Sequence, residues 1–285
     1  MTGRGKAGNP APPVLPSRDP TLETRPVPRE RHFQARSFGP GAASDIRSTV
    51  RPVKELEAMV NSDAHDDKYG DVVSLLRTIQ GYDKLSLHQD GSGLNDPTWG
   101  FFIFVTSYST AAMENLDPAV LKVVEVVRRT LEDIGHPLFA AEAHKRLKLD
   151  VLQDKEALED ASDDRIREEF NSFIRGLGFW PDDDDDTCGP LSLGRYVVGL
   201  VFDEAKILEL AGLSLPESPE DDYKALENVS IKVIDCPWQR PANGRGHYQG
   251  VDNCPITALP NLFDETSAGD SGAMMDMYPL QRKFY

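Results

Sequence analysis

The chain has 285 residues and a formal net charge of −16, and apolar residues make up 39% of it. This apolar share is below the globular norm, and Gly and Pro number 22 and 21, so we expect part of the chain to be unstructured. The acidity argues against nucleic-acid binding by the folded part, because such binding needs a basic face that displaces counterions.

The charge is unevenly distributed along the chain. Residues 1–58 hold ten Lys and Arg against six Asp and Glu, so residues 59–285 hold 21 against 41. The sequence shows neither the apolar core of a signal peptide nor a run of eighteen apolar residues, which predicts a cytoplasmic, intracellular protein without a membrane segment. The three cysteines (Cys188, Cys236, Cys254) lack Cys-x-x-Cys spacing, which favours reduced thiols.

The first part of the chain is rich in proline and in single arginines and shows no apolar periodicity. Such a segment buries too little surface to offset the entropy of ordering. We therefore predict a disordered N-terminal arm over residues 1–60, followed by a single α+β domain over residues 61–285.

The domain is predicted to begin with a helix over residues 68–80 that Gly81 ends. The stretch from Trp99 to Tyr108 holds the strongest local pattern, an unbroken apolar run from Phe101 to Val105. A run of this length and composition predicts a central strand that is buried on both faces. A helix should follow from Asp117 and Pro118 to Ile134.

The second half of the domain repeats this alternation of strands and helices. The alternating residues from Leu147 to Val151 predict an edge strand with one wet face, and Ser162 caps a helix. The apolar run from Tyr196 to Phe202 predicts a second central strand, after which Asp203 caps another helix. The last expected element is an edge strand over residues 229–233.

The burial pattern of these strands distinguishes two folds. The first and third strands are central and the second and fourth are edges, which favours an α+β, ferredoxin-like antiparallel sheet packed with helices. Because a helix follows every strand, a doubly wound α/β sheet is the alternative.

The segment from Trp99 to Trp238 resembles a family of filamentous-fungal proteins. The residues that carry the resemblance are Trp99-Gly100-Phe101 with Tyr108, Leu149 to Asp154 with Leu158, Ala161, Ser162, Ile166, Arg167 and Phe170, and Arg195-Tyr196 with Leu200 and Asp203. Members commonly carry an arginine at the position of Val105. The resemblance implies no activity, because none is assigned to that family.

The sequence predicts neither catalytic residues nor a metal site or cofactor. Gly269-Asp270-Ser271-Gly272 resembles the nucleophile loop of trypsin-like proteases, but the remaining motifs of that machinery are missing. The six histidines lack the i, i+4 spacing of a helical metal site, and no Gly-rich phosphate loop follows either central strand. Adjacent carboxylates repel one another, so the run from Asp182 to Asp186 is predicted to be a solvated loop.

Two functions remain. The first is a non-catalytic binding or protein-interaction module whose partner is another protein. The second is a small-molecule-binding protein or enzyme that acts on an apolar metabolite in a pocket on the sheet. The candidate binding residues for that pocket are Trp99, Phe102, Phe104 and Tyr108. Neither function involves nucleic acid or a membrane.

Overall fold

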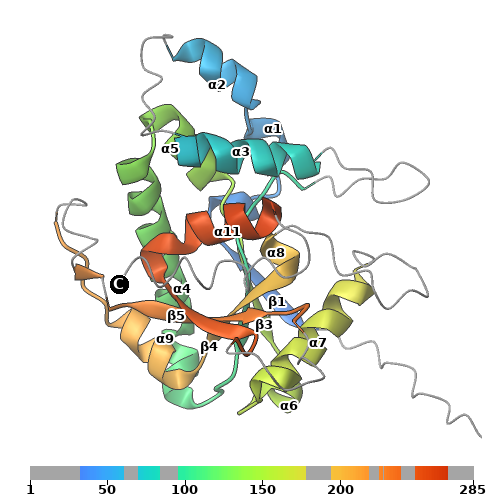
Figure 1. Ribbon diagram of the computed structural model, residues 1–285. Helices are drawn as coiled ribbons and strands as arrows, with labels where there is room; N and C mark the ends of the chain where they lie inside the picture. The colour runs from blue at the N-terminus through green and yellow to red at the C-terminus, as the bar shows by residue number, and fades with distance from the viewer. Residues whose placement is uncertain are drawn as a thin grey trace, which may run out of the picture. The chain divides into compact units, whose positions relative to one another are not determined.

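The structure is a computed structural model that describes residues 33–60, 70–83, 96–177, 194–217, 225–226, 228–238 and 248–268. These residues belong to one compact unit, His32–Tyr285, whose centre is a mixed sheet (Figure 1). The strands of the sheet are β1 (Gln34–Phe38), β2 (Phe102–Val105), β3 (Leu149–Gln153), β4 (Val198–Phe202), β5 (Ser230–Asp235) and β6 (Val251–Pro255).

The strand order across the sheet is β1-β3-β2-β4-β5-β6. β2 pairs in parallel with both β3 and β4, so that Ile103 stands opposite Val151 and Leu200. The outer pairs β1–β3, β4–β5 and β5–β6 are antiparallel. All four residues of β2 are buried, which confirms the prediction that this apolar run is a central strand.

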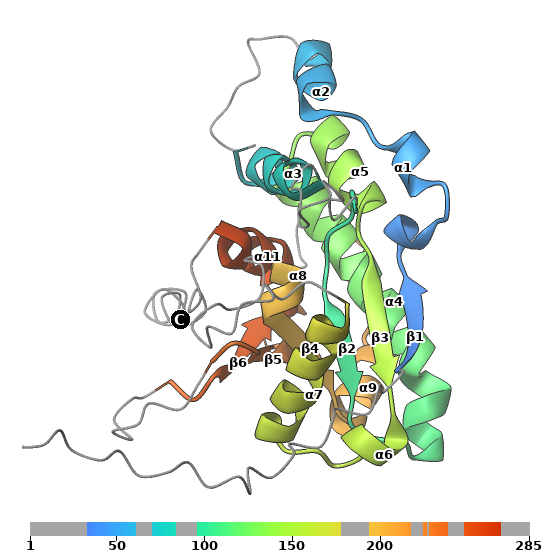
Figure 2. The same cartoon turned by 90° about the vertical axis from the view of Figure 1, so that its right-hand side faces the viewer.

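The helices cover both faces of the sheet. Connections between parallel strands are right-handed. The connection from β2 to β3 and the connection from β3 to β4 run across the sheet in opposite directions, so their helices lie on opposite faces. Figure 2 shows α7 on one face and α4 with α9 on the other. The helices are α1 (Ile46–Thr49), α2 (Val53–Met59), α3 (Gly70–Asp83), α4 (Thr110–Ile134), α5 (Pro137–Lys145), α6 (Lys155–Leu158), α7 (Asp163–Gly176), α8 (Gly194–Val197), α9 (Glu204–Ala211) and α11 (Leu259–Ala268).

The aromatic residues around β2 fill the core on both sides of the sheet. Phe101 packs against Phe263 of α11, with ring centroids 6.0 Å apart. Phe102 and Phe104 point to the other face and pack against Phe170 of α7, at 5.8 and 5.3 Å. Successive residues of an extended chain point to opposite faces, so this run builds both layers of the core.

Gly100 fixes the start of β2. Its φ is +131°, and a Cβ at this position would stand 2.2 Å from the carbonyl oxygen of Lys148. The Lys148 N–H donates to the carbonyl of Trp99 at 2.8 Å, and the Trp99 indole donates to Ala143 at 2.6 Å. A glycine is therefore required where the two parallel strands first approach one another.

The mixed α and β composition predicted from the sequence is confirmed, whereas the ferredoxin-like topology is not. A ferredoxin-like sheet is antiparallel, and here the three central strands β3, β2 and β4 run parallel. This centre has the helix-covered crossovers of the doubly wound alternative. The burial pattern from which the ferredoxin-like order was derived placed β2 and β4 at the centre but took the internal strands β3 and β5 for edges, and it carries no information on strand direction.

The arm predicted to be disordered over residues 1–60 differs from the structure in its second half. Residues 33–60 form β1, α1 and α2, and residues 1–32 lie outside the described part. β1 pairs with β3 along its whole length, so β3 is an internal strand and not the predicted edge. The polar residue Asp150 suggested that one face of this strand is exposed to solvent. The residue is instead 7% exposed, and its side chain accepts hydrogen bonds from Ser37 and Arg195.

The predicted helices are present, with shifts at their ends. Ser162 and Asp203 cap α7 and α9 as predicted, through hydrogen bonds to backbone N–H groups. α4 begins earlier than expected, because Ser109 accepts from the N–H of Ala112 and Pro118 lies inside the helix. β5 was predicted as an edge strand, but β6 pairs with its outer side. Among the described residues, no helix is both long and apolar enough to span a bilayer.

Candidate functional site

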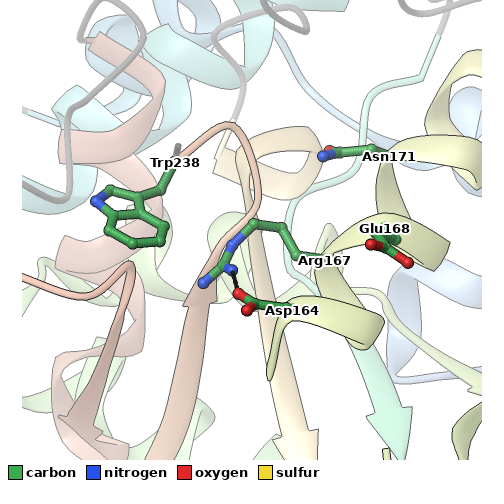
Figure 3. Close-up of a pocket in the computed structure, with 5 residues that line it drawn as sticks. All are labelled: Asp164, Arg167, Glu168, Asn171 and Trp238. Atoms are coloured by element: carbon green, nitrogen blue, oxygen red, sulfur yellow. Dashed lines mark hydrogen bonds and ion pairs between the residues drawn. The ribbon is translucent and has the colours of Figure 1, made fainter. Parts of the chain in front are cut away.

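A cavity of about 420 Å³ opens between α7 and the chain that leaves β5. Its lining residues are Asp164, Arg167, Glu168 and Asn171 of α7 together with Trp238 (Figure 3). Residues three or four positions apart lie on the same side of a helix, so the spacing of the four α7 residues places them on one face. Ser162 caps α7 two residues before Asp164.

Arg167 forms the inner wall of the cavity and is 6% exposed. Its Nε donates to the carbonyl oxygen of Asp235 at 2.9 Å, and its Nη2 donates to that of Gly250 at 3.1 Å. Its Nη1 donates to Asp164 Oδ1 at 2.6 Å. The guanidinium thus joins α7 to the ends of β5 and β6, and these bonds occupy all three of its nitrogens.

Trp238 forms the wall opposite α7. The Arg167 guanidinium carbon lies 4.9 Å from the centroid of its ring, and the Tyr248 ring packs edge-on at 6.4 Å. The indole also lies against the backbone of Gly250, whose φ is +71° and where a Cβ would stand 2.6 Å from the indole Cδ2. The indole is therefore held in place from several sides.

Asp235 lies beneath this wall and is 2% exposed. Burial raises the pKa of its carboxyl to about 6, although the hydrogen bond from Tyr248 and the charge of Arg167 act to lower it. The Tyr248 hydroxyl donates to Asp235 Oδ2 at 3.2 Å. Burial and then the charge of Asp235 raise the pKa of Tyr248, so the tyrosine stays a neutral donor.

The mouth of the cavity offers oxygen acceptors. The side chains of Asp164 and Glu168 are 67% and 71% exposed. Asn171 donates from Nδ2 to the carbonyl of Cys236 at 3.0 Å, whereas its Oδ1 is buried and has no hydrogen-bond partner. The indole nitrogen of Trp238 points away from the α7 residues (Figure 3).

The four residues predicted to line an apolar pocket lie elsewhere. Trp99, Phe102 and Phe104 are each at most 5% exposed, and Trp99 packs on Phe263, on the opposite face of the sheet from the other two. Tyr108 is half-buried, and its hydroxyl accepts from the N–H of Asp154 at 2.7 Å. Burial raises the pKa of Tyr108 to about 12. None of the four lines the cavity on α7, and their role in binding stays a prediction.

The sequence contained a weak sign of the cavity. Arg167 belongs to the residues that carry the fungal resemblance, and Asp164 three positions before it forms an ion pair with it at 2.6 Å. However, the pattern of α7 predicts that its charged residues face solvent, and arginine is seldom fully buried. The contact with Trp238 joins residues 71 positions apart, which no local pattern reveals.

The predictions on chemistry fall partly within the described residues. Among them, no three His, Cys, Asp or Glu side chains are placed to hold a metal ion together. Ser271 and the carboxylate run from Asp182 to Asp186 lie outside the described ranges.

No protein-family model, no curated protein and no solved structure matches this chain. The resemblance to the fungal family therefore stays a prediction.

Proposed function

We propose that this protein is a non-catalytic binding module and that the cavity on α7 holds its ligand. The observation that carries the proposal is that the inner wall of the cavity is fixed by hydrogen bonds of Arg167. Arg167 is buried and bonded to the backbone of both β5 and β6, so the wall is set before any ligand arrives. A site that is formed in advance loses less entropy on binding.

The cavity is an open depression with room for a small group. About 420 Å³ lies within the range of small-molecule and side-chain sites, which is roughly 300 to 1,000 Å³. The lining combines one indole with a few polar groups that converge on the same space, as such sites commonly do.

The chemistry of the lining supports binding over catalysis. The five residues include no serine, threonine, cysteine, lysine or histidine that could serve as a nucleophile or a neutral-pH base. A carboxyl that acts as a general acid near neutral pH is usually buried in apolar surroundings. Asp164 and Glu168 are instead more than two-thirds exposed.

Ligand-observed NMR on the full chain tests this proposal. The probes are N-acetyl methylamides of arginine, lysine, glutamate, leucine and phenylalanine, so that cationic, anionic and apolar groups are all represented. We expect at least one probe to show saturation transfer from the wild-type protein. The same probe should show no saturation transfer from the Trp238→Ala variant. Leu208→Ala is the control, because this side chain is apolar, 41% exposed and on α9.

The proposal fails if no probe binds, or if every bound probe also binds Trp238→Ala. Circular dichroism melting of both variants shows whether Trp238→Ala remains folded. Saturation of the leucine and phenylalanine probes alone would favour an apolar ligand at the same cavity.

A further inference from the structure

We infer that the ligand of this cavity is a cationic side chain rich in hydrogen-bond donors, with arginine on the surface of a protein partner as the best fit. This inference rests on the proposed binding function and adds the charge of the ligand to it. It follows from the acceptors at the mouth, the occupied donors of Arg167 and the charge of the chain.

The lining of the cavity has hydrogen-bond acceptors that are not fully used. Asp164 accepts one bond from Arg167 and is still 67% exposed. Glu168 forms a 3.5 Å ion pair with Arg165, an exposed pair of a kind that contributes little. Asn171 Oδ1 lacks a donor, and a buried acceptor without a partner is costly. The exposed carboxylates of Asp164 and Glu168 gain from a ligand that brings N–H donors, whereas Asn171 Oδ1 is reached only if its side chain turns.

The lining disfavours an anionic ligand. Arg167 is the cation of the lining, but its nitrogens already bond to Asp164 and to the carbonyls of Asp235 and Gly250. An anion would have to displace these bonds and would approach two exposed carboxylates. A cation meets neither cost.

The charge of the whole chain also favours a cationic ligand. Residues 59–285 hold 41 acidic against 21 basic side chains. A surface with this excess attracts basic partners over a distance of about 10 Å at moderate salt and repels acidic ones. The net charge of the chain thus favours a cationic ligand, as do the exposed carboxylates of the lining.

Geometry favours arginine over lysine. Asp164 and Glu168 lie one helical turn apart, and residues at this spacing have Cβ atoms about 6 Å apart. A planar guanidinium presents five donors in a rigid fork and can bond to two carboxylates at once, whereas an ammonium is a point charge. Asn171 lies one turn further along the same face of α7.

Titration calorimetry at low salt tests the charge. The probes are N-acetyl-arginine methylamide and its neutral isostere N-acetyl-citrulline methylamide, with the lysine and glutamate analogues alongside. We expect citrulline to bind about tenfold more weakly than arginine, because charge-assisted hydrogen bonds are about twice as strong as neutral ones. Binding of the arginine probe should weaken as salt is added.

Two charge-reversal variants test whether the arginine probe binds in this cavity. Glu168→Lys should weaken the arginine probe by at least about tenfold, because it puts a like charge at the mouth. Glu114→Lys makes the same charge change at an exposed position on α4, across the sheet, and should change affinity by less than about twofold.

Equal affinities for citrulline and arginine, or tighter binding of the glutamate probe, would overturn the inference while leaving the cavity a binding site. Equal weakening by Glu168→Lys and Glu114→Lys would also overturn it, because attraction to the general acidity would then explain the binding. If no probe binds, both the inference and the proposed function fail.

Discussion

Asp235 shows how one residue beneath the cavity couples stability to pH. Its carboxyl has a pKa of about 6 in the folded protein, raised by burial from an ordinary value of 3.8. Between these two values the folded state binds more protons than the unfolded state. The free energy of unfolding therefore falls as pH rises from about 4 to about 6 and is constant above that window. A shift of about two units corresponds to roughly 3 kcal/mol.

Asp235→Asn removes this effect, because an amide does not ionise and its oxygen can still accept from Tyr248. We expect the variant to be more stable than wild type by up to about 3 kcal/mol at pH 7.5, with the difference nearly gone at pH 4. Urea denaturation at the two pH values measures both. A difference that is the same at pH 4 and pH 7.5 would show that ionisation of Asp235 is not its source.

Arg195 and Asp150 form a second buried charge pair, at 2% and 7% exposure. Arg195 also donates to Thr98 Oγ1 at 3.2 Å, and Ser37 of β1 donates to Asp150. Removing Arg195 leaves the buried Asp150 with only the Ser37 hydrogen bond and a longer ion pair to Lys148 at 3.6 Å, which compensate its charge poorly. We expect Arg195→Met to cost about 3 to 5 kcal/mol of unfolding free energy.

The double variant Arg195→Met with Asp150→Leu should be more stable than Arg195→Met alone, because the buried carboxylate is removed as well. Lys148, which also pairs with Asp150, is 27% exposed and can turn to solvent. Chemical denaturation of both proteins provides the comparison. A double variant that is the less stable of the two would mean that Arg195 contributes mainly through its contacts with Thr98 and Phe102.

The sequence could not predict these buried charges. Arg167, Arg195 and Asp150 are residue types that usually lie at the surface. The contacts that bury them, Arg167 with the Asp235 carbonyl and Arg195 with Asp150, join residues 68 and 45 positions apart. By contrast, Ser162 and Asp203 were predicted as caps, because a cap depends on a residue three positions further along.

At the scale of elements, Gly100 determines how β2 meets β3. Gly100→Ala would place a Cβ 2.2 Å from the backbone oxygen of Lys148 at a φ of +131°. Neither the backbone nor the oxygen can move without breaking the hydrogen bond from Lys148 to Trp99. We expect a loss of more than about 3 kcal/mol, measured by urea denaturation.

Gly81→Ala is the matched control, because a Cβ there has nothing within 4 Å and the residue lies in α3. Alanine is the better helix former by up to about 1 kcal/mol, so this variant should be unchanged or slightly more stable. Equal losses in the two variants would contradict the role assigned to Gly100.

The elements that the sequence missed share a physical reason. β1 lies at an edge of the sheet, four of its five residues are exposed, and its sequence has no apolar run. β6 likewise has mostly partly exposed residues. Such strands are held by pairing with a neighbour, so their own composition hardly differs from that of a loop. The buried runs of β2 and β4 were found because their burial shows in every residue.

For the molecule as a whole, sheet topology was the feature least accessible to sequence. The apolar runs predicted which strands are central, but parallel and antiparallel pairing differ in direction and not in composition. The parallel order β3-β2-β4 follows from the helices between these strands, which were themselves predicted. The same arrangement puts α7 on one face, where its polar side can meet the chain after β5.

We propose that one face of α7, together with Trp238, forms the binding site. Backbone amide NMR of the full chain during a titration with N-acetyl-arginine methylamide tests it most directly, because each amide reports its own surroundings. We predict shifts confined to Asp164–Asn171 and to the residues around Trp238 and Gly250, saturating at one dissociation constant. Shifts that spread over the acidic surface without saturation, or that leave α7 unchanged, would contradict the account.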